Sequence, residues 1–165
     1  MAFSLTISTS QLDKPILQSL TSTGVANALH QDGYTVRSVD GREFQYVQFD
    51  SSGVAAVAGA PAVVALTSTD TAYRLVTADV SDASLTRAGA FLSILTDTYF
   101  GWIQTKGLLV DAPCTDGAGT DVGADDALGA TADSLWTKIT VGGTTDTSAV
   151  AVAAGSGGYA NIMLV

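Results

Sequence analysis

From Tyr34 onward, short runs of strand-forming residues alternate with clusters of glycine, aspartate, serine and threonine. Valine and threonine favour strands, whereas glycine and aspartate favour tight turns. The runs lie too close together for most crossover helices. The sequence therefore predicts a mainly-β fold: a small β-barrel or sandwich of short antiparallel strands.

The clearest local signal is the pair Asp40-Gly41, which separates Tyr34–Val39 from Arg42–Phe49. Asp-Gly supplies the positive φ angles of a tight hairpin turn, and Phe44 and Tyr46 fall on one face of the second run. Further strands are predicted over Val63–Leu66, Tyr73–Val76, Phe91–Leu95, Trp102–Val110, Leu135–Val141, Ala149–Ala153 and Ile162–Val165. No tandem repeat is evident.

The first 33 residues differ from the rest, and we interpret them as an N-terminal arm (1–33) leading into a β-rich body (34–165). Apolar and polar residues alternate at the start of the arm, which predicts a short edge strand. Ser10 is placed to cap a short helix behind it. The arm supplies five candidate interface residues: Phe3, Leu5, Ile7, Leu12 and Leu17.

The charge content limits the classes of partner. Charged residues are 14% of the chain, below the roughly 25% of an average globular domain. The net charge is −9, and the seven basic residues are scattered singly, so we expect no direct binding of nucleic acid. A surface so poor in charge indicates contact with other subunits.

The chain carries no predicted membrane segment or export signal. Met1 to Gln11 lacks the basic and apolar regions of a signal peptide, and the apolar run Val54–Leu66 is too short to cross a bilayer. The single cysteine, Cys114, allows no internal disulfide, which fits a reducing compartment.

Catalytic constellations are not recognisable in the sequence. The only histidine, His30, lies in the arm, away from any nucleophile elbow. Cys114 has no basic neighbour that would lower its pKa, and we interpret it as a structural thiol. Glu43 is the only glutamate. We therefore expect no enzyme activity and no cofactor.

One acidic stretch leaves an alternative open. Asp111 to Asp126 holds five aspartates, and Gly117–Val122 partly matches the Gly-x-Gly-x-Asp-x unit of calcium-binding β-rolls. Those sites need stacked copies, and only one is present here. A solvated loop is favoured, with a calcium-dependent carbohydrate-binding β module as the alternative.

The most unusual cluster is Tyr99-Phe100-Gly101-Trp102. Trp102 is predicted to lie in the core. Tyr99 and Phe100 are further candidates for a subunit interface, where aromatic residues are enriched.

This cluster carries a resemblance to a known family. Tyr99 to Gly107 resembles the Tyr-Gly-Trp-Ile-Gln-x-x-Gly signature of tailed-phage capsid decoration, or cement, proteins, with Phe100 inserted. Asp40 to Val47 is similar to their Asp-Gly-Arg-x-Phe-x-Tyr-Val hairpin, and Val122 to Gly129 to their Gly-Asp-x-Leu turn, in which Ala124 displaces the glycine. The resemblance begins near Thr35 and leaves the arm unmatched.

The resemblance implies a structural phage head protein on the exterior of the virion, made in the host cytoplasm. Such a protein binds the major capsid protein of the assembled shell, bridges neighbouring subunits, and forms a homo-oligomer, with a trimer favoured. Other virion components, namely a tail tube, head fibre or spike module, remain the alternative.

Overall fold

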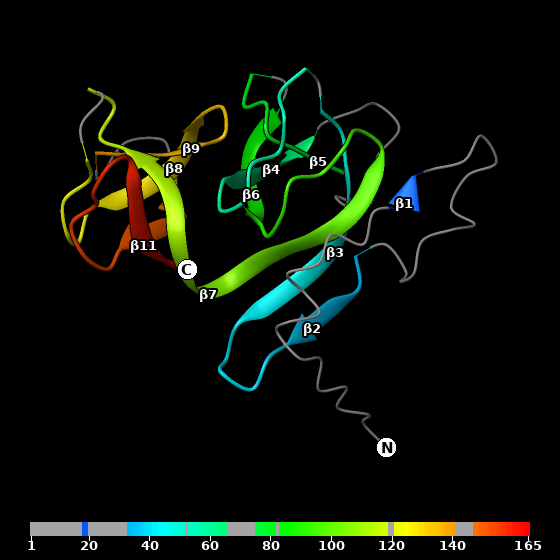
Figure 1. Ribbon diagram of the computed structural model, residues 1–165, viewed down its shortest axis with the longest axis horizontal. Helices are drawn as coiled ribbons and strands as arrows, with labels where there is room; N and C mark the ends of the chain where they lie inside the picture. Colours follow the sequence, from blue (N-terminus) through cyan, green and yellow to red (C-terminus); the bar gives the residue numbers. More distant parts are fainter. Residues whose placement is uncertain are drawn as a thin grey trace.

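The computed structural model describes residues 18–19, 33–51, 53–65, 75–81, 83–118, 121–140 and 147–165. All regular structure within these ranges is β (Figure 1). The strands are β1 (Gln18–Ser19), β2 (Thr35–Arg37), β3 (Glu43–Phe49), β4 (Pro61–Ala65), β5 (Leu75–Thr77), β6 (Ala83–Phe91), β7 (Tyr99–Thr115), β8 (Ala127–Ala132), β9 (Leu135–Lys138), β10 (Ala149–Ala151) and β11 (Tyr159–Leu164).

Five strands close a mixed barrel, and five more pack outside it. Around the barrel, β7 pairs with β11, β11 with β10, β10 with β8, β8 with β9, and β9 returns to β7. The strands β2 to β6 lie outside this ring. The predicted mainly-β fold with a barrel is therefore confirmed.

The long strand β7 belongs to two rings of strands. It bends near Gly107, whose φ is +95°, and Figure 1 shows the two halves of the strand leading to the two sides of the molecule. Its N-terminal half, Tyr99–Lys106, pairs with β3 and β6, and these connect through β4 and β5 into a second ring. We call this ring the first unit, and the barrel, which starts at Gly107, the second unit.

The two units repeat one pattern of pairing. In the first, β3 pairs parallel with β5, and the antiparallel pairs are β5–β4, β4–β6, β6–β7 and β7–β3. In the second, β7 pairs parallel with β9, and the antiparallel pairs are β9–β8, β8–β10, β10–β11 and β11–β7. The fold is therefore a duplicated five-strand motif in which β7 is the last strand of one copy and the first of the next.

Each unit has its own core. The first encloses a cluster that includes Val47, Phe49, Phe91 and Ile103, and the second encloses one built around Trp136. A third cluster lies on the other face of the β2–β3–β7 sheet and consists of Val36, Phe44, Tyr46, Phe100 and Trp102. Alternation along β3 produces both faces, because successive side chains point to opposite sides of a strand.

The predicted Asp-Gly hairpin is present as the β2–β3 connection. Gly41 has φ +85°, the Gly41 amide donates to the Ser38 carbonyl at 3.1 Å, and the Ser38 amide donates to the Arg42 carbonyl at 2.8 Å. Phe44 and Tyr46 share one face of β3, as predicted, and both are buried in the third cluster.

Other strand predictions differ from the structure in detail. The strand expected over Phe91–Leu95 ends at Phe91 and begins at Ala83, and β8 was not predicted at all. Both strands are rich in alanine and glycine, so pairing with their neighbours outweighs weak strand propensity. Two strand pairs are parallel, which the expectation of antiparallel strands did not include. The short helix expected in the arm lies outside the described residues.

Several hydrogen bonds connect the two units, and in one of them Arg87 Nη2 of β6 donates to the Val165 carbonyl. The Trp136 indole donates to the Gly59 carbonyl at 2.8 Å, within the buried interior. Near the tip of the β8–β9 hairpin, Ser134 Oγ donates to the Ala55 carbonyl, and the Val80 amide donates to Asp133 Oδ1. The second unit is therefore tied to loops of the first.

Candidate interaction surface

Of the predicted interface residues, the structure describes two. Tyr99 begins β7, is half-buried, and pairs with Ser19 of β1. Phe100 is only 3% exposed and pairs with Gln18. The other five lie outside the described residues: Phe3, Leu5, Ile7, Leu12 and Leu17.

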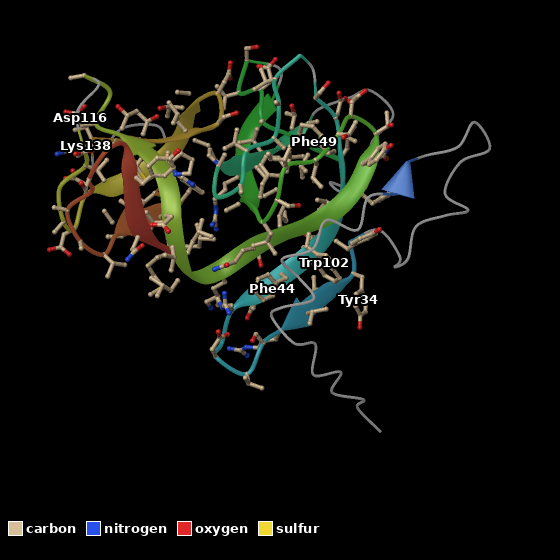
Figure 2. The ribbon with its side chains drawn as sticks, viewed as in Figure 1. Tyr34, Phe44, Phe49, Trp102, Asp116 and Lys138 are labelled. Carbon is tan, nitrogen blue, oxygen red and sulfur yellow. The ribbon has the colours of Figure 1, made fainter. Side chains whose placement is uncertain are left out.

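Phe100 belongs to a packed aromatic cluster. Its ring stacks on Tyr46 with centroids 5.7 Å apart, and Tyr46 meets Trp102 edge to face at 5.3 Å. Tyr34 extends the cluster with an edge contact to Trp102 at 6.3 Å (Figure 2). Trp102 is 3% exposed, so its predicted core position is confirmed.

Of the residues weighed for catalysis from the sequence, the structure describes Cys114 and Glu43, and both make structural contacts. Cys114 is buried in the second unit, and desolvation raises the pKa of its thiol to about 11. The thiol is therefore protonated at neutral pH, unlike an activated nucleophile. Glu43 faces Arg37 across 3.6 Å at the exposed end of the hairpin. His30 lies outside the described residues.

The aspartates of the Asp111–Asp126 stretch bind elements of their own chain. Asp121 accepts hydrogen bonds from the amides of Gly157 and Gly158, at 3.2 and 2.7 Å. Asp126 pairs with Lys138 Nζ at 2.8 Å and accepts from the Gly123 amide at 2.7 Å. No group of three or more metal-ligating side chains gathers among the residues that the structure describes.

An apolar sheet face lies on the outside of the second unit. Val150 of β10 pairs with Met163 of β11, which pairs in turn with Leu108 of β7, so three apolar residues form one row across three strands. We call this surface the β11 face and define it by six residues at outward positions: Leu108, Val110, Val150, Val152, Met163 and Val165.

The β11 face departs from the normal alternation of an exposed sheet. Ala160, Ile162 and Leu164 of β11 point into the barrel and are buried. The outward positions that follow them should then be polar. Asn161, which follows Ala160, is polar, but Met163 is 40% exposed and Val165 58% exposed. Contiguous exposed apolar surface of this kind is typical of a site that contacts another molecule.

A groove borders the β11 face on the side of the β2–β3 hairpin. Its volume is about 500 Å³, and it lies between the hairpin tip, Asp40–Arg42, and the side chains of Leu108, Val110 and Met163. The tip carries one charge of each sign, on Arg42 and Asp40. Arg42 Nε donates to Asp40 Oδ2 at 2.7 Å. The pKa of Asp40 is lowered, mainly by the hydrogen bond from the Arg42 amide.

The sequence predicted the strands of this surface but not the surface itself. Trp102–Val110 and Ile162–Val165 were both expected as strands, and β7 and β11 contain them. The pairing of Met163 with Leu108 joins residues 55 positions apart, which no local pattern reveals. The available signal was the apolar run at Ile162–Val165, where alternation fails.

Comparisons with known proteins do not assign the chain to a family. No family model matches the chain, and none of the curated proteins is significantly similar to it. No helix in the described part of the chain is long and apolar enough to span a membrane.

Proposed function

We propose that this protein is a structural phage head protein that binds the outside of the assembled capsid and stabilises it by bridging neighbouring capsid subunits. The observation that carries the proposal is the β11 face, an uncharged three-strand surface. Five of its residues are at least 40% exposed: Leu108, Val110, Val152, Met163 and Val165. The resemblance around Tyr99–Gly107 supports the choice of partner.

The β11 face suits contact with a protein lattice better than contact with nucleic acid or a small molecule. It carries no charge for phosphates, and its strands present a broad surface instead of an enclosed cavity. A homo-oligomer that binds several capsid subunits at once gains avidity, because each further contact forms at high effective concentration. Binding only to the expanded lattice then stabilises that lattice by mass action.

The proposal is tested by sedimentation with expanded capsids that lack this protein. Met163→Asp and Val110→Asp place a charge on the β11 face without touching the buried core, and we expect each to weaken binding at least tenfold. Ile94→Asp is the matched control, since Ile94 is 68% exposed in the first unit, outside this face. Equal binding by all variants would remove the β11 face from the proposal.

A second measurement separates the alternatives within a virion. The molar ratio of this protein to the major capsid protein is measured in purified particles. A ratio near one, or a simple fraction such as one-third, supports a lattice component. A ratio of a few per cent moves the function to a tail, fibre or spike.

The N-terminal arm is the second proposed contact. Deleting residues 1–17 should weaken capsid binding and leave the β-rich body folded, because all core residues within the described ranges come after Tyr34. Unchanged binding by the truncated chain would remove the arm from the proposal.

A further inference from the structure

The two units differ at one strand position. In the first unit, β3 is paired on both sides: Gln45 pairs with Ile103 of β7 on one side and with Thr35 of β2 on the other. The strand equivalent to β3 in the second unit is the C-terminal half of β7. It pairs with β11 along one side and with β9 only at Cys114 and Thr115.

The register of the two units shows where the missing strand belongs. Ile103 lies between Gln45 and Phe91 of its neighbouring strands, and Ile162 lies in the same way between Leu109 and Ala151. Leu109 is therefore the equivalent of Gln45, and because β2 pairs with Glu43–Gln45, its counterpart position lies beside Gly107–Leu109. The hydrogen bonds of Tyr46 with Gly33 and Tyr34 extend this position to Val110, the equivalent of Tyr46. Within the described ranges no strand pairs with β7 there.

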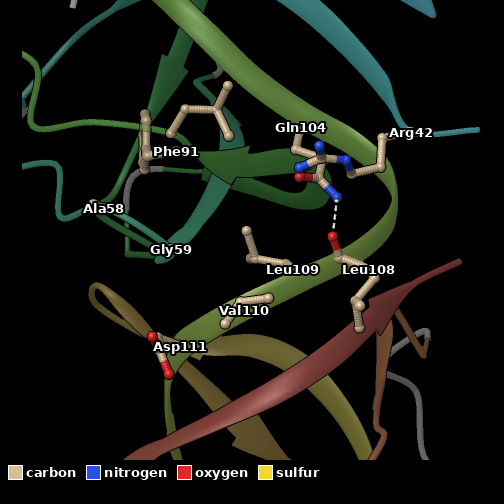
Figure 3. A pocket seen from close by; sticks show the side chains of 10 residues that line it. Arg42, Ala58, Gly59, Phe91, Gln104, Leu108, Leu109, Val110 and Asp111 are labelled. Atoms are coloured by element: carbon tan, nitrogen blue, oxygen red, sulfur yellow. Dashed lines mark hydrogen bonds between the residues drawn. The ribbon is translucent and has the colours of Figure 1, made fainter. Parts of the chain in front are cut away.

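A cleft lies at this position, inside the bend of β7 (Figure 3). Its volume is about 300 Å³. Leu109, Val110 and Asp111 form one wall, and Gly59 and Phe91 form the opposite wall. The cleft is open to solvent between the two units.

A side-chain amide occupies part of the hydrogen-bonding capacity of this edge. Gln104 is 1% exposed, and its Nε2 donates to the carbonyl oxygens of Lys106 and Leu108 at 3.2 and 3.0 Å. Two carbonyls of β7 thus accept hydrogen bonds from a side chain. In the equivalent strand of the first unit, β3, the hydrogen bonds come from the backbone of β2. Unpaired strand edges are the usual acceptors of an added strand.

We infer that the open edge of β7 at Leu108–Val110 accepts residues Phe3–Ile7 of a second copy of this chain as an added strand. The segment alternates apolar and polar residues, so one face can pack on the apolar wall of the cleft. A short segment is enough, because β2 itself has three residues.

Charge supports this choice of occupant. The first charged residue of the chain is Asp13, so the twelve residues before it are uncharged. Copies with a net charge of −9 repel each other, and an uncharged segment adds no further repulsion at the contact. The cleft itself carries one charge of each sign, on Arg42 and Asp111.

The position of β1 favours a second copy over the same chain. Gln18 and Ser19 pair with β7 at Phe100 and Tyr99. Along β7, the pairing of β6 at Ile103 and Gln104 comes between that point and the cleft. The pairing of β6 therefore separates the β1 position from the cleft along β7.

Cysteine cross-linking of the full-length chain tests the inference without any capsid present. One variant carries Leu5→Cys and the other Val110→Cys, with Ser4→Cys and Thr6→Cys covering neighbouring registers. Mixed and mildly oxidised, they should form a disulfide-linked pair at least fivefold faster than the same arm variants mixed with Ile94→Cys. The native Cys114 does not compete, because it is buried and its thiol pKa is raised to about 11.

Two further sets of variants make the result decisive. Ser4→Pro and Thr6→Pro remove amide donors from the segment without altering the folded body, and they should abolish the cross-link, whereas Thr9→Pro should not. Cross-linking only within the double variant Leu5→Cys/Val110→Cys would overturn the second copy as the source. No preference for Val110→Cys over Ile94→Cys would overturn the edge as a strand acceptor.

Discussion

The first and second units share one pairing pattern but present opposite outer faces. Phe44 of β3 and Leu108 of β7 occupy equivalent positions, since they pair with Gln104 and Met163. Phe44 is 2% exposed and packs in the aromatic cluster, whereas Leu108 is 42% exposed. Strand pairing therefore does not decide which outer face is covered. That is decided by the side chains and by what lies over them.

The same comparison holds along the neighbouring strand. Phe100 and Trp102 of β7 are buried on the outer face of the first unit. On the outer face of the second, Asn161 of β11, the equivalent of Trp102, is exposed, and Tyr159 is 52% exposed. A duplicated motif has thus kept its inner cores closed in both units, while one outer face remains available for contact.

The largest expected difference between the units is at the equivalent pair Phe44 and Leu108. Phe44→Ala should lower the free energy of unfolding by about 3 to 5 kcal/mol, because a buried ring is removed and a cavity remains. Leu108→Ala should cost no more than about 1 kcal/mol, since its side chain is already half in water. Chemical denaturation measures both.

A milder exchange controls for gross misfolding at this pair. Phe44→Leu and Leu108→Phe place the residue of each unit in the other. The first should destabilise the protein less than Phe44→Ala, and the second should leave stability nearly unchanged. Similar costs for Phe44→Ala and Leu108→Ala would contradict the contrast between the two outer faces.

The next effect concerns the connection between the units. Trp136→Phe removes the indole donor and leaves the Gly59 carbonyl without it, which should cost about 1 to 3 kcal/mol. In this variant Trp102 is the remaining tryptophan and its fluorescence reports on the first unit. Labelling of Cys114 reports on the second.

We expect the two probes to unfold together in the parent chain and to separate in Trp136→Phe. Separation would show that the two units are held as one cooperative body mainly by this contact. Coincident transitions in the variant would mean that β7 and the remaining contacts between the units are enough to couple them.

Replacing a turn glycine by alanine should lower stability by a similar amount in the two units. Gly41 ends the first hairpin turn with φ +85°, and Gly157 lies in the turn before β11 with φ +63°. An added Cβ would meet nothing within 4 Å at either position. Gly41→Ala and Gly157→Ala should each cost about 1 kcal/mol, purely from the left-handed backbone. A much larger loss at one site, measured by thermal unfolding, would reveal a contact specific to that unit.

The smallest expected effect is electrostatic and confined to the second unit. The pKa of Asp126 is lowered, mainly by its hydrogen bond with Lys138 and then by the Gly123 amide. A carboxyl with a lowered pKa stabilises the fold above its ordinary pKa of 3.8, and this contribution is lost as the pH falls through the folded value. Asp126→Asn should therefore cost a few tenths of a kcal/mol at pH 7.

The pH dependence supplies the check on this ion pair. The unfolding free energies of the parent and Asp126→Asn should converge as the pH falls below 3.8 and through the lowered pKa of the folded state, and they should also approach each other in high salt. A difference that persists in acid would mean that Asp126 acts through packing and not through its charge.

Local chemistry made part of the fold predictable. Asp40-Gly41 predicted a hairpin because few other residues adopt its backbone angles, and β2 and β3 pair there. β8 was not predicted because Ala127–Ala132 has weak strand propensity. This segment forms a strand because it pairs with β9 and β10. The duplication was equally hidden, since equivalent positions such as Phe44 and Leu108, or Gln45 and Leu109, differ in residue type.

The candidate surface was less accessible to sequence reasoning. Tyr99 and Phe100 were chosen as aromatic interface residues, but the structure shows Phe100 packed on Tyr46. Burial of that ring depends on Tyr46, which is more than fifty positions away, so the motif alone could not indicate it. The contact between Leu108 and Met163 has the same origin in long-range pairing.

The sharing of β7 has a mechanical consequence. Two domains joined by a loop swing about it, and a load on one reaches the other only after the loop is taut. Here a single extended strand runs from Tyr99 to Thr115 without interruption, with its hydrogen bonds to β3 giving way at Gly107 to those with β11. Tension applied to either half therefore passes to the other along the covalent backbone of one bent strand, with no loop between them.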